Sequence, residues 1–340
     1  MSNHEVTDAI PKMNTPNTVK PAFTYFDQLD TILKQRGKEP ELPIKNLSDL
    51  NKKLWGFKKG QLYVVGAYTS HAKTSFCLQL ARDWAEQDFS VMYLSLEIPV
   101  TRCLERLLCQ KYQIPNVSLF TGHRDQHLDS IKSFENDLKK WRLVITDCIG
   151  DSWQDVDTLV SKLNTKPDVI ILDYAQMTKR KARIQKDDFD EYIKHFREMA
   201  IRYNFCGIIV SQTGRASRES DNKDPQLHHL SGSSIFETHA DVVVLLKWNY
   251  RDTNDQKDFN KYTVYISKNN DGATGYCELY FKPENYLFFD LQEEETQKSW
   301  TEKEENRDFY AKIGFRVTQK GTIVRKGDNQ QVPKMSKEKT

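Results

Sequence analysis

Runs of apolar residues alternate with amphipathic stretches through the middle of the chain. In several runs nearly every position is apolar, as in 169–172 and 242–246. Strands of this kind are typical of a sheet that is covered on both faces, because neither side of the strand meets water. The predicted strands span residues 61–66, 90–95, 143–146, 169–172, 207–211, 242–247, 262–267 and 276–281.

Apolar residues at helical spacing fill the intervals between the earlier strands. The predicted helices span residues 74–87, 99–111, 126–139, 154–164 and 188–203. Strands that alternate with helices in this way predict an α/β fold with a doubly wound, mostly parallel sheet. No helix is predicted between the last strands, so we expect the sheet to end in antiparallel edge strands.

Two segments precede this pattern. Residues 1–21 are polar and contain prolines, which predicts a disordered segment. Residues 22–41 form a linker that contains a short amphipathic helix. This helix either packs on the chain's own core or docks on a neighbouring subunit. Its apolar face is made of Phe26, Leu29, Ile32 and Leu33.

The α/β pattern defines one domain at 42–291. After it the composition shifts, and residues 292–340 are predicted to form a charged, weakly ordered extension. A short strand pair is expected within the extension, at 315–317 and 322–324, with Gly321 at the turn.

The composition excludes several classes of protein. The 340 residues carry a net charge of +2, so any nucleic-acid site must be a local patch rather than the whole surface. The six cysteines are scattered without a C-x-x-C pair, which indicates buried thiols in a reducing compartment. Neither a signal peptide nor an apolar run long enough to span a bilayer is visible. We therefore expect a cytoplasmic protein that acts at the nucleoid, or in a host cytoplasm if phage-encoded, without a membrane partner.

A predicted strand, a tight loop and a helix start follow one another at 61–76, with Lys73 and Thr74 where the helix begins. In a P-loop such a lysine holds nucleotide phosphates and the hydroxyl holds Mg²⁺, while backbone N–H groups surround the phosphates. The arrangement therefore predicts nucleotide binding. The loop positions assigned to the nucleotide are Ala67, Ser70, Ala72, Lys73, Thr74 and Ser75.

The loop departs from the usual pattern, because Ala67 and Ala72 stand where a P-loop has its two glycines. Glycine lets the backbone turn tightly and point its N–H groups at phosphate oxygens. We expect Ala72 to be tolerated only if its φ angle stays negative. Gly66, one residue before the first glycine position, is expected to supply some of the missing flexibility.

Three further polar residues come at the ends of predicted strands. Asp173 ends an apolar strand in the Walker B pattern and would hold Mg²⁺, although an acid that caps a core strand is the alternative. Glu97 suits a base that orients the attacking water, or else an acid that begins the helix after Pro99. Gln212 is expected at the same edge of the sheet, where its amide would sense the γ-phosphate.

These stretches, in this order, resemble the RecA-like motor domain of the DnaB family of replicative hexameric helicases. The resemblance covers about residues 42–290. Besides the phosphate loop and its lead-in at 47–62, the matching stretches are Ser95-Leu-Glu-Ile-Pro99 (S-L-E-M-P in the family), Asp173-Tyr-Ala-Gln176 (D-Y-L-Q), Ser211-Gln-Thr-Gly-Arg215 (S-Q-L-N-R), 230–241 (L-R-x-S-G-x-I-E-x-x-A-D) and 268–275 (K-Q-R-N-G-P-T-G).

The resemblance implies a RecA-like fold, ATP and Mg²⁺ as ligands, and Glu97 as the catalytic base. It also implies a homo-oligomer, as a hexameric ring, that translocates on single-stranded DNA during DNA replication. A primase or a helicase loader is an expected further partner. Only about 40 residues precede the motor, which resembles the minimal form in some phage or plasmid proteins.

Two positions depart from the family pattern. Ala72 replaces the glycine before the lysine, and Asn270 replaces the arginine finger, which reaches the γ-phosphate of the next protomer. Such arginines contribute on the order of 10³–10⁵ in rate in related NTPases. Lys268 matches the family's lysine and would act in trans as a partial substitute, although a point charge matches phosphate less well than a guanidinium. We therefore expect slow or partner-dependent hydrolysis.

A basic stretch after the Walker B strand is the predicted DNA contact. It holds five cations in eight residues, and the corresponding loop of the family lines the central channel. Cations there would neutralise backbone phosphates and make binding depend on salt; a solvated loop is the alternative. The predicted DNA-binding residues are Lys179, Arg180, Lys181, Arg183, Lys186 and, after Gln212, Arg215.

Three functions remain open from the sequence. The first is an ATP-driven, ring-forming DNA helicase. The second is a helicase paralogue that binds nucleotide and DNA, or another helicase, with weak or no hydrolysis, which the alanines of the loop and Asn270 favour. The third is a recombinase-like filament protein on the same core fold, against which 95–99 and 268–275 argue.

Overall fold

The computed structural model describes residues 21–35, 39–146, 152–173, 186–213, 224–230, 233–291, 315–317 and 323–325. The chain divides into two units, Met1–Pro40 and Glu41–Thr340. In the first unit, η1 (Ala22–Tyr25) and α1 (Phe26–Gln35) form the helix that the sequence predicts. The exposed large apolar side chains of this unit include Phe23, Tyr25, Phe26, Leu29 and Leu33.

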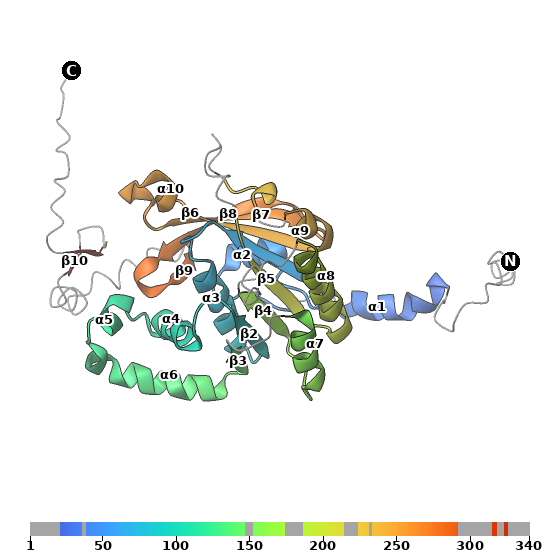
Figure 1. The fold of residues 1–340 in the computed structure, drawn as a ribbon, viewed down its shortest axis with the longest axis horizontal. Helices are drawn as coiled ribbons and strands as arrows, with labels where there is room; N and C mark the ends of the chain where they lie inside the picture. Colours follow the sequence, from blue (N-terminus) through green and yellow to red (C-terminus); the bar gives the residue numbers. More distant parts are fainter. Residues whose placement is uncertain are drawn as a thin grey trace, which may run out of the picture. The chain divides into compact units, whose positions relative to one another are not determined.

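Nine described strands of the second unit form one sheet, in the order β3-β2-β4-β5-β1-β6-β7-β8-β9 (Figure 1). Neighbours from β3 to β6 pair parallel, and neighbours from β6 to β9 pair antiparallel. The predicted mostly parallel sheet with antiparallel edge strands is confirmed. The strands are β1 (Leu62–Ala67), β2 (Val91–Ser95), β3 (Leu143–Thr146), β4 (Val169–Asp173), β5 (Cys206–Gln212), β6 (Val242–Trp248), β7 (Lys261–Asn269), β8 (Gly275–Lys282) and β9 (Leu287–Asp290).

Helices cover both faces of this sheet (Figure 1). Side chains of β1 alternate between the two cores: Tyr63 and Val65 pack with α3, α4 and α6, whereas Leu62 and Val64 pack with α7, α8 and α9. Burial on both faces explains the continuous apolar runs. The helices are α2 (Ser48–Leu54), α3 (Lys73–Ala85), α4 (Val100–Tyr112), α5 (Asn116–Phe120), α6 (Leu128–Lys140), α7 (Trp153–Lys162), α8 (Lys186–Tyr203), α9 (Ser233–His239) and α10 (Tyr250–Thr253).

The topology brings the carboxyl ends of β1, β2, β4 and β5 to one edge of the sheet. The phosphate loop, Glu97, Asp173 and Gln212 end or follow these strands, so they share that edge. β7 runs antiparallel, and its last residue pairs with the first residue of β6. The segment 268–275 therefore lies at the opposite, amino-terminal edge.

The extension after the domain contains two short strands. β10 (Phe315–Val317) and β11 (Ile323–Arg325) form an antiparallel pair close to the predicted positions, while Gly321 is outside the described residues. The five described cysteines are buried and unbridged. Within the described part of the chain, the helices are all too short or too polar to cross a membrane.

Candidate active site

The phosphate loop connects the end of β1 at Ala67 to the start of α3 at Lys73. Ser70 and Ala72 both adopt the left-handed region, with φ angles of 68° and 57°. The expectation of a negative φ at Ala72 is therefore wrong. This conformation costs a residue other than glycine roughly 1–2 kcal/mol, but it turns successive backbone N–H groups into a concave anion-binding arrangement. The loop thus has the form of a phosphate cradle without glycine in it.

Gly66 does not provide flexibility to the loop, contrary to the expectation from its position. It lies inside β1, where an added Cβ would come within 2.3 Å of Leu230 Cδ2 and 2.8 Å of Leu245 Cδ2. Two neighbouring leucines occupy the space of a side chain. Glycine is needed there because of close packing.

A cavity of about 420 Å³ lies over the loop and unites most of the predicted site. Ala67 is not among its lining residues, because it is buried in β1 below the loop. Asp173 is also fully buried, behind the cavity. The predicted residues that line the cavity are Ser70, Ala72, Lys73, Thr74, Ser75, Glu97 and Gln212.

Asp173 ends β4 with no exposed surface. Its Oδ2 atom accepts a hydrogen bond of 2.5 Å from the Tyr93 hydroxyl, and the Thr74 hydroxyl also bonds to the carboxylate. Burial raises the pKa of Asp173, and these two hydrogen bonds oppose that rise. Its Oδ1 atom is buried without a hydrogen-bond partner. A carboxylate with one free oxygen beside a hydroxyl is a donor set that suits Mg²⁺.

Lys73 begins α3 and is 7% exposed. Its Nζ lies 3.4 Å from the Tyr68 carbonyl oxygen. Burial lowers the pKa of Lys73, while the charges of Glu97 and Asp173 act in the opposite direction. The ammonium group therefore lies in the field of both carboxylates, at the base of the cavity.

Glu97 and Gln212 reach the cavity from β2 and β5. The residue before Glu97, Leu96, donates its N–H to the Asp173 carbonyl at 2.6 Å, which ties the two carboxylate-bearing segments together. Glu97 is exposed to solvent, as a base that binds water must be. Gln212 donates from Nε2 to the Thr69 hydroxyl at 2.7 Å and so connects β5 directly to the phosphate loop.

Several residues of the site are missing from the sequence prediction. Tyr93 lies on β2 and reaches Asp173 on the neighbouring strand. Arg106 on α4 and Arg251 on α10 line the same cavity, and their guanidinium carbons lie 5.3 Å from the Tyr286 ring and 4.8 Å from the Trp248 ring. No motif around these residues indicates the site, because they reach it through packing of distant segments.

Residues 44–290 match the family model described as the DnaB-like helicase C-terminal domain. The chain belongs to this family. The earlier resemblance is therefore confirmed over most of the chain.

The relatives of this DnaB-like domain are replicative helicases. The replicative DNA helicases DnaC of Bacillus subtilis and DnaB of Geobacillus stearothermophilus are each 24% identical over 277 residues, which cover 78% of this chain and 60% of each relative. The chain therefore spans less than two thirds of their length. The ATPase domain of G40P matches in structure with a TM-score of 0.71 and 21% identity, over 80% of this chain and 99% of that domain.

Lys268 is not brought to the cavity of this DnaB-like domain. It lies near the end of β7, at the amino-terminal edge, and its Nζ donates to the carbonyl oxygens of Glu237 and Ala240 at 2.6 Å each. These carbonyls belong to the C-terminal end of α9 and the residue that follows it. Burial lowers the pKa of Lys268. Any contact of Lys268 with phosphate would involve the cavity of another copy.

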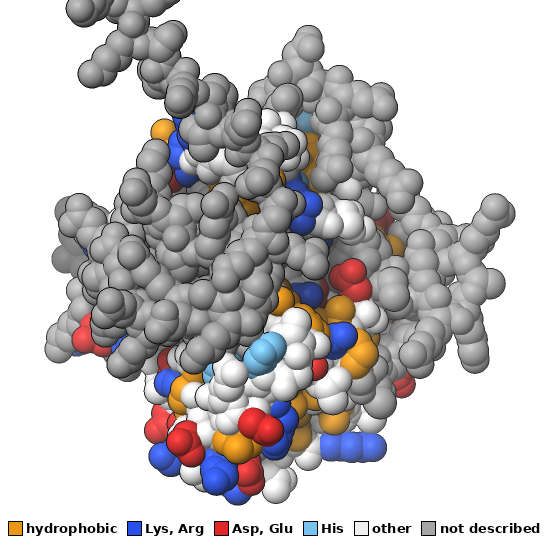
Figure 2. Space-filling model, turned by 90° about the vertical axis from the view of Figure 1, so that its left-hand side faces the viewer, with side chains coloured by type: hydrophobic (Ala, Val, Ile, Leu, Met, Phe, Trp, Pro, Cys, Tyr) orange, Lys and Arg blue, Asp and Glu red, His pale blue; other side chains and the backbone are white. Residues whose placement is uncertain are grey.

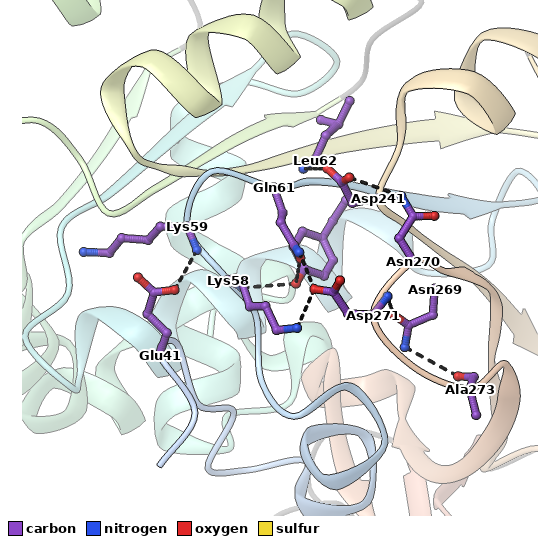
Figure 3. A network of polar contacts seen from close by, with 11 residues as sticks. Glu41, Lys58, Lys59, Gln61, Leu62, Asp241, Asn269, Asn270, Asp271 and Ala273 are labelled. Carbon is purple, nitrogen blue, oxygen red and sulfur yellow. Dashed lines mark hydrogen bonds and ion pairs between the residues drawn. The ribbon is translucent and has the colours of Figure 1, made fainter. Parts of the chain in front are cut away.

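The segment around Asn270 is held against the start of β1 (Figure 3). Asn270 donates its backbone N–H to the Asp241 carbonyl at 2.9 Å, and its side chain approaches Asp241 Oδ1 at 3.3 Å. The carboxylate of Asp271 accepts from Lys58 and Gln61 at 2.6 Å each. At the position that the resemblance assigns to the arginine finger, this chain therefore has a short amide bonded to its own domain.

Most predicted DNA contacts lie outside the described residues: Lys179, Arg180, Lys181, Arg183 and Arg215. Lys186 begins α8, but its side chain is not among those described. In Figure 2, basic and acidic side chains are interspersed over the lower part of the face, at the level of α5 and α6 in Figure 1. That described surface has mixed charge, unlike the basic stretch at 179–186.

Proposed function

We propose that this chain is an ATP-dependent, ring-forming DNA helicase that translocates on single-stranded DNA during DNA replication. The cavity that unites Lys73, Thr74, Glu97 and Gln212, with Asp173 behind it, is the observation that carries the proposal. These are a phosphate-binding cation, a metal-binding pair, a base and a γ-phosphate sensor in one place. Membership of the DnaB-like family supports the same function.

In this mechanism Lys73 and the loop N–H groups bind the phosphates of ATP. Thr74 and Asp173 would hold Mg²⁺, which when bound offsets the charge on the phosphate oxygens. Glu97 orients the attacking water and accepts its proton. Gln212 couples the phosphate state to β5 through its hydrogen bond to Thr69. The adenine base of ATP is proposed to lie at the far end of the cavity, near Arg106 and Arg251.

We propose the following organisation for the chain. Residues 42–291 form the motor, 1–21 and the helical linker 22–41 precede it, and the charged extension 292–340 follows it. Copies assemble into a ring, and the basic residues at 179–186 with Arg215 contact the DNA backbone. Primase is a candidate partner. One solved structure, of a DnaB-like replicative helicase and its interactions with primase, matches 80% of this chain with a TM-score of 0.71.

A specific observation favours a second function, an accessory paralogue with weak hydrolysis. Asn270 is bonded to Asp241, and Lys268 is bonded to two carbonyls of its own domain. Neither side chain is free of partners within the chain, so neither resembles an arginine finger held ready for a neighbour. In this case the ring binds ATP and DNA, but another subunit supplies the missing cation.

The test is ATP turnover of the purified chain with and without single-stranded DNA, together with ATP binding. We expect Lys73→Ala to abolish turnover and weaken binding. Glu97→Gln should retain binding and lower turnover by about 10²–10⁴. Lys139→Ala is the matched control, because that lysine is exposed on α6 and bonds only to Glu135 among described residues. Turnover that is equal in all four proteins would refute the helicase proposal, and binding without turnover would favour the paralogue.

A further inference from the structure

Two residues of the phosphate loop adopt a conformation that costs free energy. Ser70 and Ala72 both have left-handed φ angles, although neither is glycine. In isolation such a segment would relax to negative φ, and its N–H groups would then turn away from a common centre. Contacts from the rest of the domain must therefore hold the loop in its concave form.

His71, between these two residues, is fully buried, although its neighbours Ser70 and Ala72 line the cavity. Its Nδ1 atom accepts a hydrogen bond of 3.0 Å from the backbone N–H of Trp248. Because Nδ1 accepts this hydrogen bond, it carries no proton, and the proton of the neutral imidazole is on Nε2.

The position of Trp248 explains this bond. β1 ends at Ala67, which pairs with Leu246 on β6, and Trp248 lies two residues further along β6. The backbone N–H of Trp248 therefore points to the side where β1 has left the sheet. The imidazole of His71 takes the place of the missing strand residue and satisfies a buried donor that would otherwise cost free energy.

The main chain of His71 is held as well. Its carbonyl oxygen accepts a hydrogen bond of 2.5 Å from the hydroxyl of Tyr262, which is also fully buried. Tyr262 pairs with Trp248 across β7 and β6. Two adjacent strands thus bind the side chain and the main chain of one residue, directly before the strained Ala72.

We propose that His71 is the positioning residue that holds this glycine-free loop in its phosphate-binding form. The bonds to Trp248 and Tyr262 offset the strain that a glycine would avoid at this position, and they hold Ala72 in the left-handed conformation. The ligand is the phosphate chain of a nucleoside triphosphate, so the inference rests on the proposed ATP binding.

The experiment measures the affinity for ATP with Mg²⁺ by titration calorimetry. His71→Leu keeps the volume but removes the acceptor, whereas His71→Asn keeps an acceptor oxygen close to the position of Nδ1. We expect His71→Leu to weaken binding by about 10–100-fold, because a buried donor loses its partner and the loop is released. His71→Asn should restore most of this loss.

The ATP affinity of the double variant His71→Leu/Ala72→Gly distinguishes control of the loop conformation from a general loss of stability. Glycine adopts the left-handed conformation without the steric cost, so it should recover at least about fivefold of the affinity lost in His71→Leu. His127→Leu is the matched control, since that histidine also bonds to a neighbouring side chain but does not line the cavity. It should bind ATP like the unmodified protein.

The outcomes separate the two proposals. If the unmodified protein does not bind ATP, the proposed function fails and takes this inference with it. If it binds ATP and His71→Leu binds equally well, the inference alone is overturned. If His71→Leu does not fold, Tyr262→Phe replaces it, with an expected loss of about 3–10-fold that Ala72→Gly again reduces; equal binding by Tyr262→Phe also overturns the inference.

Discussion

The substitution Tyr93→Phe tests how the buried carboxylate of Asp173 is kept ready for a metal ion. It removes one oxygen atom, the hydroxyl that donates to Asp173 Oδ2 at 2.5 Å, and leaves the ring in place. Both residues have no exposed surface, so water does not replace the lost donor. The perturbation is therefore one hydrogen bond to a buried acid.

The expected size of this effect is the strength of one hydrogen bond to a charged acceptor. A hydrogen bond to a charged group contributes about 1.5–3 kcal/mol, which corresponds to roughly 1–2 pKa units. Burial already raises the pKa of Asp173, and the Tyr93 hydroxyl opposes that rise. Without the hydroxyl the pKa rises further. A protonated carboxyl does not bind Mg²⁺, so the acidic limb of Mg²⁺-dependent turnover should move to higher pH by about 1–2 units.

The assay is ATP turnover at limiting Mg²⁺ as a function of pH, followed far enough on the acid side to define the acidic limb of each protein. Tyr63→Phe is the matched control, because Tyr63 is 1% exposed and its hydroxyl donates to Gln61 at 2.9 Å, but at the opposite edge of the sheet. Both variants should lose stability. An unchanged acidic limb in Tyr93→Phe, or an equal shift in Tyr63→Phe, would show that Tyr93 does not tune Asp173.

Three further predictions concern stability and turnover. Burial raises the pKa of Asp83 to about 6. The stability that protonated Asp83 contributes is therefore present at low pH and is lost as pH rises through about 6. Urea unfolding of Asp83→Asn should lack this decline, which amounts to about 3 kcal/mol. Gly66→Ala should cost about 1–3 kcal/mol in urea unfolding, because the added Cβ meets two leucines, whereas Gly275→Ala, with no atom within 4 Å, should be nearly neutral. Asn270→Arg should raise turnover of the assembled ring by at least about tenfold, and Asn270→Gln should not; equal turnover in both would exclude a missing finger as the cause of slow hydrolysis.

The order of the strands β1–β8 and of the helices α3, α4, α6, α7 and α8 was predictable from the sequence, because each strand of a doubly wound sheet is buried on both faces and each helix on one. This produces long apolar runs and helical periods that are visible locally. β9 (Leu287–Asp290) was not predicted, and neither were the short helices α2, α5, α9 and α10. The shared location of Glu97, Asp173 and Gln212 was also predictable, because the carboxyl ends of parallel strands meet at one edge.

Contacts between distant segments set the properties of the site that local patterns do not contain. Alanine by itself disfavours a positive φ, so the conformation of Ala72 was predicted with the wrong sign; the bonds of His71 to β6 and β7 explain the angle that is observed. Tyr93 gives no local signal, since its function depends on Asp173 on the next strand.

Residue types and their spacing along the chain were thus enough to establish the family, the α/β architecture and the edge that carries the phosphate loop, because these depend on burial periods and on motifs that are contiguous in sequence. Packing between segments far apart in the chain determined the left-handed Ala72, the tuned carboxylate of Asp173 and the in-chain partners of Lys268 and Asn270. Hydrogen bonds across a folded core have no local period, and their partners become neighbours only when the sheet is assembled.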